Sequence, residues 1–220
     1  MTMEFSFQGF SEETIRFFSE LRENNSKQWF EKNRPVFDDA VMPEAKGFVV
    51  EMGDRLLTLA PNIVAIPKTN QSIFRIYRDT RFSHDKHPYK THMGIFFWEG
   101  SGKKLENSGF YFQLEPEKLL LGVGLYIFPK HLIQLYRDSV VHPKYGPALK
   151  QILENIQKNP SYQLGWKKYK RTPREYDPEH PNAELLLYGG LGFSYEEPLP
   201  KIIYSEKIAD YVFKIFKDNE

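Results

Sequence analysis

Residues 109–127 read GFYFQLEPEKLLLGVGLYI, and this stretch decides the class of fold. Its first part places Phe110, Phe112 and Leu114 at every second position, which is the spacing of a strand with one buried face. A Glu-Pro-Glu turn at residues 115–117 then leads into a run of apolar residues that is typical of a second, buried strand. Two strands joined by so short a turn predict an antiparallel hairpin.

The period of the apolar residues divides the whole chain into three parts. Residues 11–60 have helical spacing, about residues 72–127 have the two-residue period of strands, and residues 130–220 mix helical patterns with loops. We predict a single α+β domain over residues 1–220, in which N-terminal helices pack on a central, largely antiparallel β-sheet and C-terminal helices follow. The expected strands are residues 72–77, 92–98, 109–114 and 118–127, the expected later helices are residues 130–138, 147–159 and 205–217, and the expected caps of the first two helices are Ser11 and Ser26.

Composition limits the classes of function. The 220 residues are 40% hydrophobic, enough for a sizeable core, and the formal net charge of +1 argues against wrapping of nucleic acid over a long basic face. Because cysteine is absent, disulfides, a thiolate nucleophile and cysteine-rich zinc sites are excluded. The N-terminus, MTMEFSFQGF, lacks the features of a signal peptide, and the longest apolar run, residues 119–128, is too short to span a membrane as a helix. We expect a cytoplasmic protein without membrane contact.

A local excess of positive charge lies in residues 73–92, IFRIYRDTRFSHDKHPYKTH, which we call the basic hairpin. Five arginine and lysine side chains lie here with only two carboxylates, although the chain as a whole is nearly neutral. Aromatic residues are interleaved with the charges. Arginine offers a planar fork of N–H donors that matches phosphate or carboxylate, and aromatic rings hold such forks or stack on a ligand. The basic hairpin is therefore expected to bind an anion.

The expected ligand-binding residues have basic or phenolic side chains and all lie in the basic hairpin. They are Arg75, Tyr77, Arg78, Arg81, Lys86, Tyr89 and Lys90. The arginines are expected to grip the anion, the lysines to attract it, and a tyrosine to stack on it or to donate a hydrogen bond to it. We also expect at least two of the arginines to converge with Tyr89 or Lys90 on one concave surface.

Catalysis would require a titrating group as well as a grip on the ligand. The weak candidates are Asp79, Tyr89 and His180, so whether the chain is an enzyme is left open. Asp177 and His180 combine a carboxylate with an imidazole, as in a general base, but the prolines that follow both residues favour a structural role in a loop. In a structural interpretation of the basic hairpin, its arginines form ion pairs with Asp79, Asp85 or acids elsewhere.

Metal binding is considered for His84, His87 and His92, which lie near Asp79 and Asp85 in the sequence. These residues are ligands of the right type, yet the His-x-x-His spacing beside a proline lacks the i, i+4 geometry of a helical metal motif. Nearby cations would also repel a metal ion. We therefore predict no metal and no cofactor.

Three functions are compatible with these patterns. The leading hypothesis is the binding of a small anionic ligand that bears phosphate or carboxylate, with catalysis undecided. The first alternative is a nucleic-acid-associated protein, in which the cations contact phosphates and the aromatic rings stack on bases. The second alternative is a structural or protein-interaction domain, in which internal ion pairs consume the arginines.

The basic hairpin also resembles the signature of a known family. Residues 74–83, FRIYRDTRFS, followed by Asp85 and Lys86 and then by residues 88–92, PYKTH, are similar to the central motif of the conserved hypothetical family DUF2461, a domain of unknown function. The flanking features of the resemblance are Asn24, Asn25, Trp29, Phe30 and Asn33 early in the chain, and Lys170, Arg171, Pro173, Asp177, Pro178, His180 and Pro181 late in the chain. The resemblance spans nearly the whole chain and implies the place of a site but no activity. Residues 189–192, GGLG, depart from the more polar or basic run that the family pattern implies.

Overall fold

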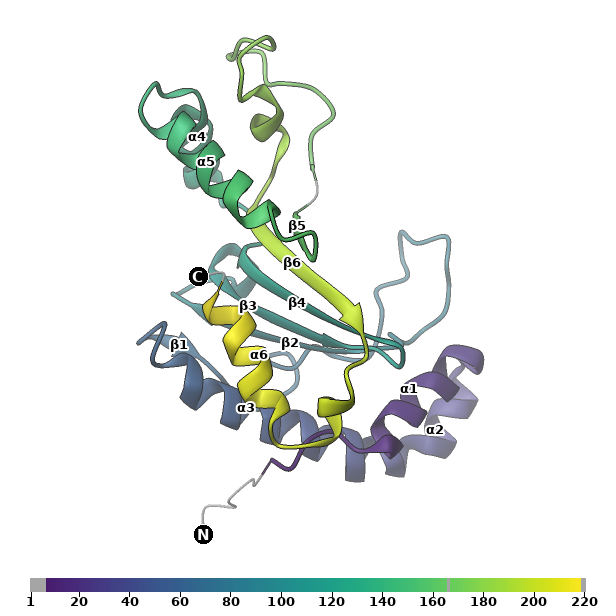
Figure 1. The fold of residues 1–220 in the computed structure, drawn as a ribbon. Helices are drawn as coiled ribbons and strands as arrows, with labels where there is room; N and C mark the ends of the chain where they lie inside the picture. The colour runs from purple at the N-terminus through teal and green to yellow at the C-terminus, as the bar shows by residue number, and fades with distance from the viewer. Residues whose placement is uncertain (1–6, 166, 219–220) are drawn as a thin grey trace.

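The hairpin predicted from residues 109–127 forms the centre of a β-sheet in the computed structural model, which describes residues 7–165 and 167–218 (Figure 1). Strand β3 (Ser108–Leu114) and strand β4 (Lys118–Leu125) pair antiparallel, with Phe112 opposite Leu121. Phe112 and Leu121 are both buried, as the alternation of apolar residues requires. The predicted hairpin is therefore confirmed.

Six strands make up the sheet within the described residues, in the order β1-β2-β3-β4-β6-β5, and every neighbouring pair is antiparallel. The other four strands are β1 (Ile63–Val64), β2 (Met93–Glu99), β5 (Tyr162–Leu164) and β6 (Leu191–Pro198). Helices cover the sheet, so the predicted α+β class with a largely antiparallel sheet is confirmed.

The extent of the sheet differs from the prediction at two places. Residues 72–77 were expected to form a strand, but they contribute isolated bridges, including Ile73 opposite Ile95, because the chain leaves the edge of β2 after Phe74. Strands β5 and β6 lie in the part of the chain for which helices and loops were expected. One glycine and several polar residues interrupt β6, LGFSYEEP, so its two-residue period is weak.

Glycines allow β4 and β6 to approach each other closely. Gly124 has a φ of +128°, and a Cβ atom there would lie 2.4 Å from the carbonyl oxygen of Leu191. A Cβ atom on Gly190 would lie 2.2 Å from the carbonyl oxygen of Tyr126. This close contact gives residues 189–192 a structural role in the sheet.

Serine side chains begin the first two helices, as predicted. Ser11 caps α1 (Glu12–Glu23) by accepting a hydrogen bond from the backbone N–H of Thr14, and Ser26 caps α2 (Lys27–Val36) by accepting one from Trp29. A π-helical turn, Phe37–Val41, joins α2 to α3 (Met42–Leu56). The later helices are α4 (Lys130–Val141), α5 (Tyr145–Gln157) and α6 (Ile208–Lys217), with short 3-10 helices at Lys104–Glu106, Ala183–Leu187 and Lys201–Tyr204.

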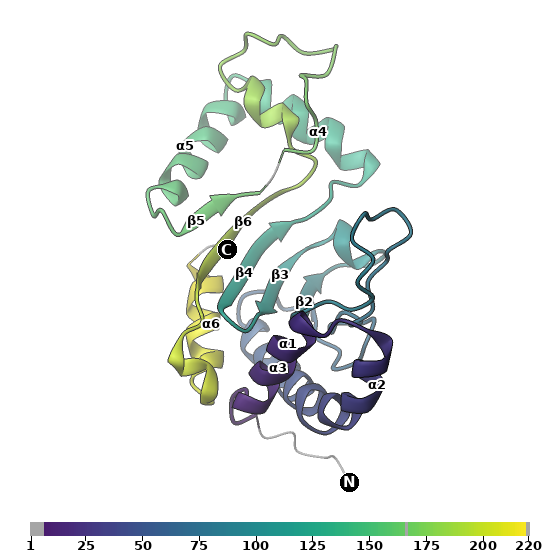
Figure 2. The ribbon, with the colours of Figure 1, turned by 90° about the vertical axis from the view of Figure 1, so that its right-hand side faces the viewer.

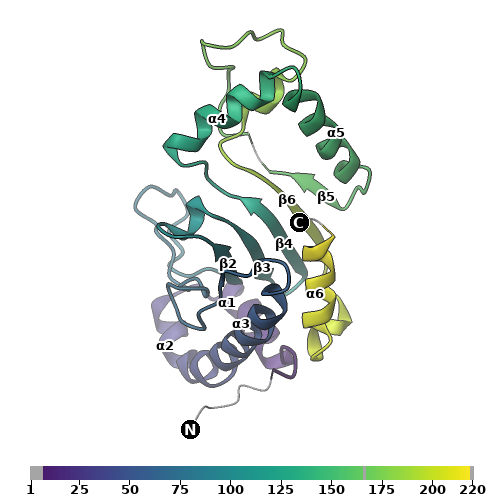
Figure 3. The same ribbon diagram turned by 90° about the vertical axis from the view of Figure 1, so that its left-hand side faces the viewer.

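The helices lie at two places around the sheet. Helices α3 and α6 contact each other and cover one face of the sheet, and α1 and α2 lie at the end where β2 begins (Figures 1 and 2). Helices α4 and α5 lie beyond the end where β6 begins, together with the loop of residues 167–181 (Figure 3). This loop lies in the part of the chain, residues 130–220, for which a mixture of helical patterns and loops was expected.

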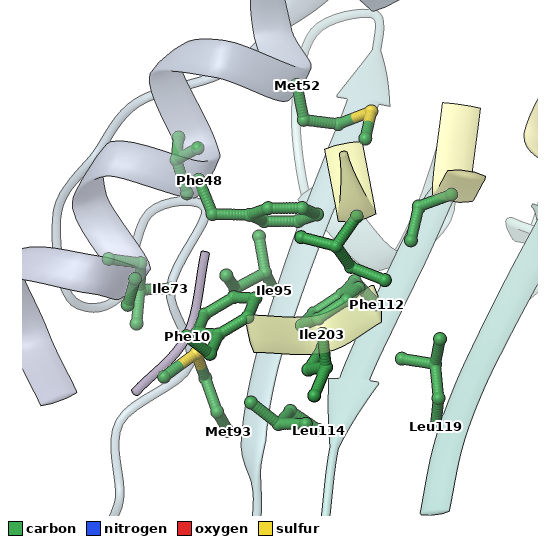
Figure 4. Close-up of a cluster of buried hydrophobic side chains, with 14 of the residues drawn as sticks. Phe10, Phe48, Met52, Ile73, Met93, Ile95, Phe112, Leu114, Leu119 and Ile203 are labelled. Atoms are coloured by element: carbon green, nitrogen blue, oxygen red, sulfur yellow. The ribbon is translucent and has the colours of Figure 1, made fainter. Parts of the chain in front are cut away.

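Aromatic rings form the centre of the core between α3 and the sheet (Figure 4). The rings of Phe48 on α3 and Phe112 on β3 are 4.4 Å apart, and Phe10 stacks on Phe112 at 5.6 Å. Phe110 and Phe216 extend this contact to α6, with ring centroids 5.1 Å apart. Burial of these rings holds the helices to one face of the sheet.

The structure tests the prediction about membrane-spanning helices, but not the prediction about a signal peptide. In the two described stretches, every helix is too short or too polar to cross a bilayer. The apolar run of residues 119–128 lies mainly in β4, as expected for a buried strand. Residues 1–6 of the N-terminus, from which the absence of a signal peptide was predicted, lie outside the described residues.

Replacing Phe112 with Ala should lower the free energy of unfolding by about 3–5 kcal/mol, because it leaves a cavity under Phe10 and Phe48. Urea unfolding followed by circular dichroism measures this loss. Phe82→Ala is the matched control, since Phe82 is 94% exposed and its loss should change the free energy by less than about 0.5 kcal/mol. Equal losses in the two variants would contradict the core described here.

Candidate functional site

The basic hairpin forms a loop on a short, paired base. Tyr77 and Tyr89 lie opposite each other, and the backbone N–H groups of Arg78 and Lys90 donate to the carbonyl oxygens of Pro88 and Ile76, each at 2.8 Å. Residues 78–88, which we call the hairpin loop, project from the sheet near α1 and α2 (Figure 1). Arg75 and Tyr77 are exposed and Ile76 is buried, so the side chains alternate between two faces at this base.

The side chain of Asn25 fixes the base of the hairpin loop. Its amide nitrogen donates to the carbonyl oxygen of Tyr89 at 2.9 Å, and its amide oxygen accepts from the N–H of Tyr89 at 3.0 Å. The Tyr89 ring is 2% exposed and stacks on Phe30 of α2, with centroids 4.3 Å apart. The sequence gives no sign of this role for Asn25, because the contact joins residues that are 64 positions apart.

Two arginines of the hairpin loop are paired with carboxylates of the same loop. Arg81 donates two hydrogen bonds to Asp79, at 2.7 and 2.9 Å, and this contact lowers the pKa of Asp79 to about 2. Asp85 accepts from the backbone N–H of His87 and from Arg78 at 2.5 Å, and these bonds lower its pKa to about 2. Internal ion pairs, as in the structural interpretation, therefore exist for Arg78 and Arg81.

A hollow of about 360 Å³ lies beside the base of the hairpin loop. Its lining residues are Arg22, Asn25, Arg78, Asp85, His87, Tyr89, Lys90, Thr91 and His92. Among the predicted ligand-binding residues, the hollow brings together Arg78, Tyr89 and Lys90, whereas Arg75, Tyr77, Arg81 and Lys86 lie outside its lining.

The expected convergence of two hairpin arginines on one concave surface was wrong for this hollow. Arg81 points away, 76% exposed and bound to Asp79, and Arg75 lies on the exposed side of the hairpin base. The second arginine of the hollow is Arg22 of α1, whose guanidinium lies 3.2 Å from Glu117 and 3.7 Å from Glu115. Sequence patterns give no indication of Arg22, because it reaches the hollow only through the packing of α1.

Lys90 differs from the two paired arginines. In the part of the chain that the structure describes, no carboxylate lies within 4 Å of Lys90 or of Arg75. The ammonium nitrogen of Lys90 lies 5.1 Å from the centre of the Phe74 ring, and that of Lys104 lies 4.0 Å from the same ring. Burial, and then the nearby charge of Arg75, lower the pKa of Lys90. Burial, and then Lys90, lower that of Lys104, which donates to the carbonyl oxygen of Gln71 at 2.6 Å.

His92 is a neutral side chain in the lining of the hollow. Burial and the nearby Lys90 lower its pKa to about 4, so it carries no charge at neutral pH. The structure does not assemble His84, His87 and His92 into a metal site, since no group of three or more potential metal ligands occurs within residues 7–165 and 167–218.

The three weak catalytic candidates lie in different surroundings. Asp79 is exposed and paired with Arg81, Tyr89 is buried against Phe30, and His180 belongs to the loop beside α4. The Nδ1 atom of His180 accepts from the backbone N–H of Asn182 at 3.1 Å. The carboxylate of Asp177 accepts from the N–H of Glu179 at 2.9 Å, which is the structural role that the neighbouring prolines favoured.

Comparison with known proteins gives one match. A family model described as conserved hypothetical protein (DUF2461) matches residues 13–220, nearly the whole chain. No curated protein and no solved structure is significantly similar to the chain. The family description names no activity, so the chemistry of the hollow must be inferred from its residues.

His92 should make the fold sensitive to mild acid. Its pKa is about 4 in the folded protein and about 6.5 in an unfolded chain, so the unfolded chain binds an extra proton as the pH falls between these values. Between pH 7 and pH 5 the free energy of unfolding should therefore decrease by about 2 kcal/mol on account of His92. Urea unfolding at the two pH values should show that His92→Gln removes this decrease.

His84→Gln is the control for this experiment, because His84 is exposed and lies in the hairpin loop. This variant should lose as much stability in acid as the unmodified protein. A His92→Gln protein that loses the same amount as His84→Gln would contradict the proposed burial of a neutral imidazole.

Proposed function

The chain belongs to the DUF2461 family of conserved hypothetical proteins, and from the residues that line the hollow beside the basic hairpin we propose that it binds there a small ligand with a phosphate or carboxylate group. Three basic side chains line the hollow: Arg22, Arg78 and Lys90. The observation that supports the proposal best is the partly buried Lys90, which has no carboxylate within 4 Å among the described residues.

The partly buried charge of Lys90 lowers the stability of the ligand-free protein. A charged group that is partly removed from water is destabilising unless an opposite charge or hydrogen bonds compensate it. Arg75 and Lys104 add positive charge nearby, which raises this cost further. An anion in the hollow would accept a hydrogen bond from Lys90. Its negative charge would also offset the repulsion that Lys90 experiences from Arg75 and Lys104.

The two arginines of the hollow, Arg78 and Arg22, would contribute hydrogen-bond donors that are already held in place. Asp85 and the carbonyl oxygen of His87 hold the Nη1 atom of Arg78 at 2.5 and 3.2 Å, and two glutamates hold Arg22. Side chains held in this way lose little conformational freedom when they bind. Arg78 and Arg22 would therefore offer their remaining N–H donors as a prearranged surface, and Lys90 would supply the charge that is not yet balanced.

The proposal concerns binding, and it assigns no reaction. Asp79, with a pKa of about 2 and two hydrogen bonds from Arg81, is a weak base. The ring of Tyr89 packs against Phe30 and Tyr77, and burial raises the pKa of its phenol. His92 is a neutral imidazole in the lining of the hollow, and we assign it the role of a hydrogen-bonding partner for the ligand.

Lys90→Met should have opposite effects on stability and on binding. Removing an unbalanced, partly buried charge should raise the free energy of unfolding of the ligand-free protein by roughly 1 kcal/mol. The same change should abolish the rise in melting temperature that a bound anion produces in the unmodified protein. Thermal-shift measurements with inorganic phosphate, sugar phosphates, nucleotides and small dicarboxylates test both effects.

Lys103→Met is the matched control, since Lys103 is 82% exposed and pairs with Glu106 at 3.1 Å. It should change neither the melting temperature nor the response to anions. If no compound of this panel raises the melting temperature of the unmodified protein, or if Lys90→Met responds as that protein does, the proposal is wrong.

Arg78→Ala should weaken binding of a phosphate compound by about 2 kcal/mol or more, roughly 30-fold in Kd, because it removes a partly desolvated donor. Arg55→Ala is its control: the side chain of Arg55 is 26% exposed against 27% for Arg78, and it is also ion-paired, to Asp210, but it lies on α3. Calorimetric titration measures both affinities. Equal losses that disappear at high salt would indicate non-specific attraction instead.

A further inference from the structure

Phe82 is the most exposed large apolar side chain of the described protein, at 94% of its surface. It lies near the middle of the hairpin loop, between the paired residues Tyr77 and Tyr89 of the base. Burial of a phenyl ring is worth about 2 kcal/mol, so a ring left in water is a feature that calls for a partner. The anion-binding hollow does not use this ring.

The hairpin loop is braced from within by polar contacts. Arg81 is bound to Asp79 through two hydrogen bonds, Arg78 is bound to Asp85, and the ammonium group of Lys86 donates to the carbonyl oxygen of Thr80 at 3.0 Å. These contacts hold the backbone on both sides of Phe82. The ring is thus presented outward by a loop that internal contacts brace, and such bracing reduces the entropy that binding would cost.

Basic side chains lie near the exposed ring in the loop, and one of them, Arg81, also pairs with Asp79. The guanidinium carbon of Arg81 lies 5.8 Å from the centre of the Phe82 ring, and Arg81 is itself 76% exposed. Lys86 and His84 of the same loop are exposed as well. A partner that fits this surface carries flat apolar rings and negative charges at short, regular spacing.

We infer that the hairpin loop binds single-stranded nucleic acid, with a base stacked on Phe82 and the adjoining phosphates beside Arg81 and Lys86. Unpaired bases expose a flat face to any aromatic ring, and each stacked base contributes strongly to affinity without a requirement for sequence. The phosphates on both sides of the base lie where the loop carries its cations.

Two other anionic surfaces fit the loop less well. A bilayer surface takes up a broad apolar face, whereas Phe82 is the one large apolar side chain that is exposed among residues 78–88. Double-stranded DNA keeps its bases stacked on each other and is held through many phosphates, for which a chain of net charge +1 offers no long basic face. A short contact with an unpaired strand needs neither a broad apolar face nor a long basic face.

The experiment compares two strands of equal charge. Fluorescence anisotropy would measure binding of the protein to a thymidine strand of about 12 nucleotides and to an abasic strand of the same length, which has the phosphates but no bases. The unmodified protein should bind the thymidine strand at least about fivefold more tightly, and Phe82→Ala should reduce this ratio to about one. Phe82→Trp should keep the preference, because it keeps a ring.

Leu135→Ala is the control for loss of an exposed apolar side chain, since Leu135 is 60% exposed on α4. It should bind both strands as the unmodified protein does. Equal affinity of the unmodified protein for the two strands, or an unchanged preference in Phe82→Ala, would overturn the inference. Binding to phosphatidylserine vesicles that depends on Phe82, without a preference between the strands, would assign the loop to a membrane surface instead.

Discussion

The two hydrogen bonds between the side chain of Asn25 and the backbone of Tyr89 set the position of the basic hairpin and of the candidate site beside it. The amide side chain of Asn25 pairs with both the backbone N–H and the carbonyl oxygen of Tyr89, as a neighbouring strand would. It does so at a position beyond the end of the sheet. Neighbouring residues of an extended chain point to opposite sides, so the stack of Tyr89 on Phe30 turns Lys90 toward Phe74. The helices α1 and α2 thereby decide which way the basic hairpin faces.

Charge pairing then separates the cations of the basic hairpin into two groups. Arg78 and Arg81 are held by carboxylates only seven and two residues away, and these short contacts give the hairpin loop its shape. Lys90 and Lys104 are instead placed on one aromatic ring without a carboxylate within 4 Å among the described residues, which costs stability. Groups that lower stability in this way are expected where a ligand supplies the missing charge.

Local patterns were enough to predict the central hairpin, the serine caps and the place of the basic hairpin, because each depends on residues close together in the sequence. Strand β6 was missed because its short alternation is interrupted by glycine and acidic residues. The roles of Asn25 and Lys104 depend on contacts 64 and 33 residues away, and neither residue type is distinctive where it occurs. Lys104 in particular follows a Gly-Ser-Gly stretch that is typical of a solvent-exposed loop, yet its ammonium group is half-buried beside Lys90.

A crystal soaked in selenate tests the central claim most directly, because selenium scatters anomalously and the anion resembles phosphate and sulfate in shape. An anion held by Lys90 should give an anomalous peak in the hollow, with a selenate oxygen about 3 Å from the ammonium nitrogen of Lys90 and a second within reach of Arg78. A hollow that stays empty while selenate occupies other cationic surfaces of the same crystal would contradict the assignment of this site.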